Sequence, residues 1–179
     1  MKQKGLRYDG SIDKYPIAEG EIYCLGNGSK ITIADITNGL PDFSKKADCV
    51  FIDPAGNKGV LKAYYTKAEK ACPVQSFDEF VTYIKSCIEQ IKPERIFVEC
   101  FARNKNQILP MVESLFPNVK VYNNTYYHIK KNECWIIQGS KQPEDWGLDG
   151  MDEWDAVFKI CKEVPFNAIT DFFLGQGLV

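Results

Sequence analysis

Two short segments of the sequence place an acidic residue where an apolar strand runs into a turn. Asp53 stands in FIDPAGN (51–57), and Asp171 stands in ITDFFLGQG (169–177). The carboxyl ends of neighbouring strands in an open α/β sheet face one crevice, so we expect Asp53 and Asp171 to border a common site. Gly175 and Gly177 allow the backbone to approach a ligand, as a cofactor loop requires, although a GxG after a strand is also typical of an ordinary turn.

The rest of the chain contains the strands that would bring these two ends together. CVFID (49–53) and RIFVEC (95–100) are predicted to be buried strands, because their apolar residues are continuous. EIYCLGN and SKITIADIT predict a hairpin or strand pair, and VKVYNNTYYHI and ECWIIQG predict two more strands. Strands alternating with helices predict an α/β fold, with a three-layer arrangement, parallel strands and ligands at the strand carboxyl ends.

Three segments have the periodicity of helices. Residues 77–91 keep their apolar side chains on one helical face, and Ser76 with Glu79 forms a capping box before them. NQILPMVESLF (106–116) predicts a second helix, which Pro110 weakens unless it lies in the first turn. The third helix, DEWDAVFKICKEV, places four residues on one face: Trp154, Val157, Phe158 and Cys161.

Composition limits the partners and the location of the protein. Lys and Arg number 22 against 24 for Asp and Glu, so a net charge of -2 gives no overall attraction to nucleic acid or anionic membrane. No run of 18 apolar residues exists and the first residues are polar, so we expect a cytoplasmic protein without a membrane segment. The seven cysteines form no CxxC pair and His128 is the only histidine, which favours reduced core cysteines and no metal site.

The order of these motifs resembles that of the S-adenosylmethionine-dependent DNA amino-methyltransferases of the N6-adenine type in which the catalytic motif precedes the cofactor motif. In that family a run like KITIADIT leads into a strand that ends in Asp-Pro-Pro-aromatic, matched here by DPAG (53–56). An acid followed by aromatic-x-Gly-x-Gly appears near the other end, matched here by DFFLGQG (171–177). The resemblance covers about residues 20–179 and rests on order and spacing more than on any one motif.

The resemblance implies a Rossmann-like methyltransferase sheet with helices on both faces. It implies one domain over residues 1–179, with 1–20 as a flexible N-terminal segment. It also implies S-adenosylmethionine as the cofactor. The residues that match the family's cofactor positions are Asp35 for the adenine, and Asp171, Phe173, Gly175 and Gly177 for the methionine end.

The resemblance further implies methyl transfer to an exocyclic amine of a DNA base, with adenine N6 as the expected acceptor. Asp53 and the carbonyl of Pro54 would accept the two amine hydrogens, so that the nitrogen lone pair points at the methyl group. Catalysis would then consist mostly of positioning two bound reactants. The target base would leave the duplex and stack on an aromatic ring.

One departure from the family pattern lies within the catalytic motif. Gly56 occupies the position of the stacking aromatic residue, and Ala55 replaces the second proline. Because stacking is worth about 1–3 kcal/mol per base, its loss should weaken target capture roughly ten- to a hundredfold, and we expect weak or absent methylation. Four tyrosines are candidates to supply a ring from elsewhere: Tyr64, Tyr65, Tyr126 and Tyr127.

A second departure lies at the end of the sequence. Val179 follows the GxG directly, whereas the family continues into a helix and a strand that carries an acid for the cofactor ribose. We therefore expect an incomplete sheet with an open edge beside the strand at 169–173. A truncated chain, a second chain that completes the sheet, and a different closure of the sheet remain as alternatives.

A basic segment is the candidate contact for nucleic acid. Lys58 and Lys62 lie beside Tyr64 and Tyr65, and basic side chains interleaved with aromatic rings suit a nucleic-acid groove. The same pattern is also typical of a solvated helix face. The sequence does not fix the acceptor, and RNA or a protein is as consistent with it as DNA. Two other functions stay open: a catalytically weak or inactive methyltransferase-like binding subunit, and an unrelated nucleotide-binding α/β protein, which the lack of a Walker-type GKS/T motif disfavours.

Overall fold

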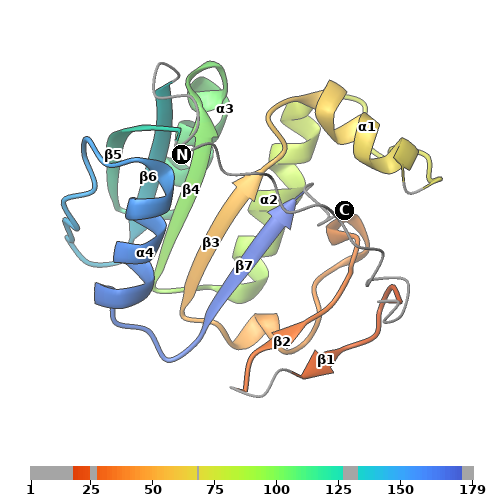
Figure 1. The fold of residues 1–179 in the computed structure, drawn as a ribbon, viewed down its shortest axis with the longest axis horizontal. Helices are drawn as coiled ribbons and strands as arrows, with labels where there is room; N and C mark the ends of the chain where they lie inside the picture. The colour runs from red at the N-terminus through yellow and green to blue at the C-terminus, as the bar shows by residue number, and fades with distance from the viewer. Residues whose placement is uncertain (1–17, 25–27, 68, 127–132, 175–179) are drawn as a thin grey trace, which may run out of the picture.

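The main sheet has five strands in the order β5-β6-β4-β3-β7 (Figure 1). The computed structural model describes residues 18–24, 28–67, 69–126 and 133–174. β3 pairs in parallel with β4 on one side and with β7 on the other, as expected for the strands that carry Asp53 and Asp171. The strand bounds are β3 Cys49–Pro54, β4 Arg95–Phe101, β5 Asn118–Thr125, β6 Glu133–Ser140 and β7 Ile169–Leu174.

The sheet is mixed, so the prediction of parallel strands is confirmed for β4, β3 and β7 and is wrong for β6. β6 runs antiparallel to both β4 and β5. Only residues 126–132 separate β5 from β6. A parallel pair needs a crossover of roughly a dozen residues or more. Because this connection is shorter, the two strands must run antiparallel.

Helices cover both faces of the sheet. α2 (Phe77–Ile91) and α3 (Lys105–Leu115) lie on one face, and α4 (Glu153–Glu163) lies on the other (Figure 1). Successive residues of β3 point to opposite faces, so Val50 packs in the α2 and α3 core while Phe51 packs in the α4 core. This arrangement confirms the α/β class and the three layers.

α2 forms as its sequence predicts. The Ser76 side chain accepts a hydrogen bond from the Glu79 backbone N–H (3.0 Å), while the Glu79 carboxylate accepts one from the Gln75 N–H. The helix ends at Lys92, which has a left-handed backbone (φ 55°), just before Pro93. The predicted apolar face is buried in full: Phe77, Phe80, Val81, Ile84, Cys87, Ile88 and Ile91.

α4 packs through a different face from the aromatic stripe that periodicity groups together. Its buried residues are Glu153, Ala156 and Ile160, whereas Trp154 and Phe158 are 52% and 66% exposed. The two large rings lie next to each other on the outside of the helix, with centroids 6.3 Å apart. The core prediction holds for four of the seven free cysteines, Cys49, Cys87, Cys100 and Cys134, while Cys24 and Cys161 are exposed.

The predicted strand pair near the start of the chain is confirmed but short. β1 (Tyr23–Cys24) and β2 (Lys30–Ile31) pair antiparallel in a separate two-stranded sheet.

None of the described helices is long and apolar enough to cross a membrane. α1 (Lys58–Lys67) follows β3 directly and lies beyond its carboxyl end (Figure 1).

Asp48, which immediately precedes β3, joins three strands at their amino ends. Its carbonyl accepts hydrogen bonds from the backbone N–H groups of Glu94 (2.8 Å) and Arg95 (3.3 Å), at the start of β4. Its carboxylate accepts from the backbone N–H groups of Asn167 (2.9 Å) and Ala168 (3.1 Å), just before β7, and from the Asn167 side chain (2.9 Å). Burial opposes ionisation, but these hydrogen bonds outweigh it and lower the pKa of the Asp48 carboxyl from its usual value.

We expect Asp48→Asn to lower the free energy of unfolding at pH 7 by about 1–2 kcal/mol, because a neutral acceptor replaces a charged one. Since the native pKa is lowered, the contribution is present above the unfolded pKa of about 4 and is lost as the pH falls through the native pKa. Urea denaturation of both proteins at pH 7 and pH 2.5 measures it. Asp42→Asn, at a 95% exposed carboxylate, is the control, with an expected change below about 0.5 kcal/mol. An equal loss at both pH values would contradict the assignment.

Candidate functional site

The carboxyl ends of β3 and β7 lie side by side. Asp53 is opposite Phe173, and Pro54 is opposite Leu174, whereas Asp171 is opposite Phe51. The expectation that the two strands end at one edge is therefore confirmed for the backbone. The side chains of Asp171 and Phe173 and the whole of Gly175 and Gly177 lie outside the described part of the chain.

Asp53 is a carboxyl group in a poorly hydrated position. Burial first, and the nearby charge of Glu153 second, raise its pKa from the usual value to about 6. Glu153 is the first residue of α4 and is only 8% exposed. A carboxyl group with a pKa near neutrality can accept a hydrogen bond as the anion and can also take up a proton, which suits acid–base work at a site.

A third acid, Glu99, belongs to the same edge. It lies one residue beyond Val98, which pairs with Ile52, so parallel register sets Glu99 beside Asp53 on the α4 face of the sheet. Both acids lie near Tyr126. Burial is the largest cause of the raised pKa of the Tyr126 phenol, and Cys134, Glu99 and Asp53 contribute after it. Three elements, β3, β4 and α4, thus bring carboxyl groups together. Among the described residues, however, no cluster of potential ligands could hold a metal ion.

Gly56 is packed against a ring that belongs to another strand. A Cβ at position 56 would lie 2.4 Å from Cε2 and 2.8 Å from Cδ2 of Phe101, the last residue of β4. The Phe101 ring lies 5.0 Å from the ring of Tyr126 between centroids, and the guanidinium carbon of Arg103 lies 5.0 Å from the Phe101 centroid. Phe101 is 37% exposed, so an aromatic surface lies beside the DPAG segment although the segment itself has no aromatic residue.

Asp35 has a local structural role. Its Oδ1 accepts hydrogen bonds from the backbone N–H (3.0 Å) and the hydroxyl (2.7 Å) of Thr37, which fixes the turn at Ile36–Asn38. Its side chain is also hydrogen-bonded to Tyr65 of α1, and burial together with this bond raises the pKa of Tyr65. The structure therefore connects Asp35 to the helix that follows Asp53.

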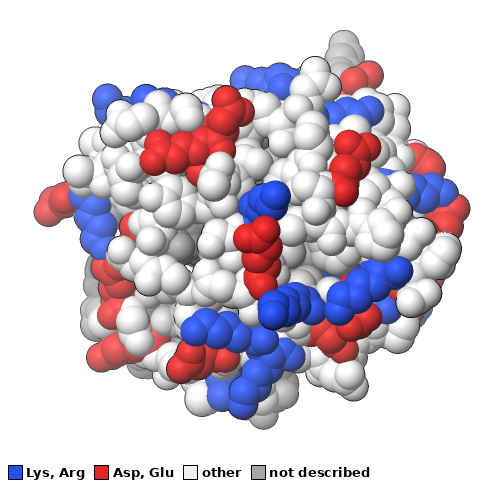
Figure 2. Space-filling view, turned by 180° about the vertical axis from the view of Figure 1, so that it is seen from behind, with Lys and Arg blue, Asp and Glu red and all other residues white. Residues whose placement is uncertain are grey.

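The candidate nucleic-acid residues on α1 differ in exposure and in their contacts. The Lys58 ammonium donates to the carbonyl of Gln75, Lys62 is exposed, and Tyr65 is half-buried against the α2 core, while the side chain of Tyr64 is not described. Asn57 caps this helix, because its Oδ1 accepts from the Val60 N–H at 2.9 Å. Figure 2 shows basic and acidic side chains interspersed over the α2 and α3 side of the molecule, so the described residues give that side no field of one sign.

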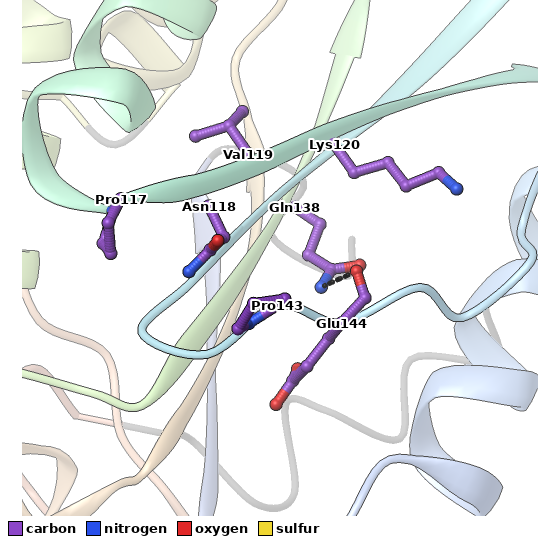
Figure 3. A pocket seen from close by; sticks show the side chains of 7 residues that line it. All are labelled: Pro117, Asn118, Val119, Lys120, Gln138, Pro143 and Glu144. Carbon is purple, nitrogen blue, oxygen red and sulfur yellow. Dashed lines mark hydrogen bonds between the residues drawn. The ribbon is translucent and has the colours of Figure 1, made fainter.

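A shallow hollow of about 360 Å³ lies at the opposite end of the sheet (Figure 3). Its polar lining is engaged in the fold: Gln138 donates to the Glu144 carbonyl (3.4 Å) and accepts from Tyr122 (2.7 Å), and the Glu144 carboxylate pairs with Arg95 (2.9 Å). These polar groups therefore already have their hydrogen-bonding and charged partners within the fold. The carboxyl edge, where the acids and the exposed ring converge, is the better candidate site.

Sequence reasoning did not single out Glu99, Glu153 or Phe101. Glu99 had a visible signal, because an acid inside the apolar run IFVEC is uncommon in a buried strand unless it is paired or functional. Glu153 and Phe101 had none, since their importance depends on contacts across the fold. No protein-family model matches the chain, and no curated protein sequence matches it.

We expect Asp53→Asn to raise the free energy of unfolding at pH 8 by up to about 3 kcal/mol. The native pKa of about 6 lies above the unfolded value, so the native state binds the proton more tightly and wild-type stability falls as the pH rises from about 4 to 6. Asparagine removes this penalty. Melting temperatures at pH 8 and pH 4 measure the difference, which should nearly vanish at pH 4. A variant that is less stable at pH 8 would contradict the raised pKa.

We expect Gly56→Ala to cost about 1–3 kcal/mol of folding free energy, because its Cβ must displace the Phe101 ring. In a Phe101→Ala background the same change should cost much less, since the obstructing atoms are gone. Urea denaturation of the four proteins of this double-mutant cycle gives the coupling energy, expected at about 1 kcal/mol or more. Equal costs in the two backgrounds would show that position 56 and Phe101 do not touch.

Proposed function

We propose that the chain is a methyltransferase-like domain that uses S-adenosylmethionine to methylate an exocyclic amine of a nucleobase. Adenine N6 in DNA is the first candidate, and RNA is the alternative acceptor. The observation that carries the proposal is the adjacency of Asp53 and Pro54 to Phe173 and Leu174. The two motifs whose order resembles the family thus meet at backbone level, although most of the chain separates them.

A Rossmann-like sheet is part of this proposal. Its support is the run of three parallel strands, β4-β3-β7, with helices on both faces. In such sheets ligands bind outside the carboxyl ends of the strands, which is where Asp53 lies. Among the described strands, β7 pairs only with β3, so a second chain that adds to this edge also belongs to the proposal.

The described residues fit S-adenosylmethionine where they can be compared with it. The segment that would hold its methionine end leaves β7 at the level of Asp53, close to the acceptor site. Asp35, the candidate for its adenine, already accepts hydrogen bonds from Thr37 and is hydrogen-bonded to Tyr65, so it would bind only through the acceptor capacity that these bonds leave. When bound, S-adenosylmethionine supplies a methyl group on a positively charged sulfur.

The residues of the chain would prepare the amine to accept that methyl group. The ionised Asp53 carboxylate accepts a hydrogen bond from the amine, and the Pro54 carbonyl accepts the second. These bonds favour a pyramidal nitrogen, whose lone pair is no longer delocalised into the ring. The methylated nitrogen must lose one proton, and Asp53, with a pKa of about 6, can hold that proton before it passes to water.

A second candidate function is that of a binding subunit without catalysis. The observation that favours it is Gly56, which leaves the motif without its own stacking ring. Such a subunit would bind the cofactor or the nucleic acid and transfer no methyl group. Retained binding of S-adenosylhomocysteine with no transfer by the wild-type chain would select this function, and binding of a nucleoside phosphate in its place would indicate a different nucleotide-binding protein.

The decisive experiment combines calorimetric titration with S-adenosylhomocysteine and transfer of a labelled methyl group to adenine-containing DNA or RNA. We expect Asp53→Ala to reduce transfer by about 100-fold or more while the affinity for S-adenosylhomocysteine changes little, because Asp53 acts on the acceptor. The wild-type rate should fall as the pH drops below about 6, where Asp53 becomes protonated. Asp42→Ala, at an exposed carboxylate, is the control and should match the wild type. A folded wild-type chain that neither binds S-adenosylhomocysteine nor transfers methyl would refute the proposal.

A further inference from the structure

The position of the missing stacking ring is filled from a neighbouring strand. Gly56 has no side chain, and the space next to its Cα is occupied by the edge of the Phe101 ring. Any side chain at position 56 would begin within 3 Å of that ring. Glycine at position 56 and phenylalanine at position 101 are therefore complementary: one leaves the space that the other uses.

The Phe101 ring is firmly supported and yet accessible. Tyr126 lies behind it at 5.0 Å between centroids, with an interplanar angle of 39°. Tyr126 is itself half-buried and hydrogen-bonded to Cys134, so it is a rigid support. Phe101 nevertheless keeps 37% of its surface exposed, so part of the ring can be reached from solvent.

The ring also lies on the same side of the sheet as the candidate catalytic carboxylate. Phe101 follows Glu99 by two residues, and Glu99 stands beside Asp53, so alternation along β4 sets all three on the α4 face. Asp53 is close enough to Tyr126 for its charge to act on the phenol. A flat group resting on Phe101 would therefore have its edge near Asp53.

Arg103 adds a cation to this surface. Its guanidinium carbon lies 5.0 Å from the Phe101 centroid, so the exposed ring already accepts a planar group. Arg103 is exposed, and no described carboxylate lies within salt-bridge distance of it. A guanidinium that can leave the ring is well suited to bind a phosphate of the nucleotide whose base takes its place.

We propose that Phe101 is the surface on which the target nucleobase stacks, supplied by β4 in place of the aromatic residue absent from position 56. This inference rests on the proposed function and adds to it the residue that captures the acceptor. It also removes the reason for expecting weak methylation, because the ring is present in space though absent from the motif. The ligand class is a single-stranded or flipped nucleotide with a planar base and an adjacent phosphate.

The test uses the full chain and a single-stranded oligodeoxynucleotide that carries one fluorescent 2-aminopurine in place of adenine. Stacking on Phe101 should quench its emission, and Phe101→Ala should abolish the quenching and raise Kd roughly ten- to a hundredfold. Phe101→Tyr, which keeps a ring, should retain both. Phe158→Ala, which removes an exposed ring from α4, is the matched control and should behave as the wild type.

Binding of S-adenosylhomocysteine separates failure of this inference from failure of the proposed function. In Phe101→Ala that affinity should stay unchanged, and the KM for the nucleic acid should rise more than kcat falls. Unchanged quenching and KM in Phe101→Ala, with the cofactor analogue still bound, would overturn the role of Phe101 and leave the methyltransferase proposal standing. Absence of cofactor-analogue binding and methyl transfer in the folded wild type would overturn both.

Discussion

The rest of the structure depends on β3, which pairs with a strand on each side. Asp48, the residue just before β3, starts both pairings. The backbone carbonyl of Asp48 accepts hydrogen bonds from the start of β4, and its carboxylate accepts hydrogen bonds from the residues that lead into β7. Both neighbouring strands are thereby aligned with β3 before its first residue. Because parallel strands keep their register along their length, this alignment also decides which residues meet at the far end, where Asp53 lies opposite Phe173.

The charged side chains at the two ends of the sheet have different surroundings. At the amino end, Arg95 forms a close pair with Glu144, and hydrogen bonds lower the pKa of Asp48. At the carboxyl end, carboxyl groups from β3, β4 and α4 gather instead, and the pKa of Asp53 is raised to about 6. Such an arrangement costs folding stability, and proteins usually keep a destabilising cluster of acids only where it serves a function. The contrast favours the carboxyl edge over the hollow at the other end.

Gly56 and Phe101 show that the space beside a residue without a side chain can be filled by a ring from another strand. A linear motif describes one strand and the loop after it, whereas a site is built from several strand ends. The ring of Phe101 reaches the space beside Gly56 because β4 pairs with β3 and extends one residue past its end. Under the proposed function, the departure at position 56 therefore counts less against methyl transfer than the sequence suggests.

The sequence alone determined the elements whose signals are local. The capped helix α2, the buried strands β3 and β4, and the acid at the end of β3 follow from periodicity, capping and apolar runs within a few residues of each other. The sequence also placed Trp154 and Phe158 on one face of α4, but it did not show that this face is exposed. Periodicity shows which residues share a face and not what that face contacts. Only the tertiary structure decided that β6 is reversed, that Glu99 and Glu153 surround Asp53, and that Phe101 stands at Gly56. These contacts join segments far apart in the chain, and they are set by strand register and layer packing, which no local pattern of residues encodes.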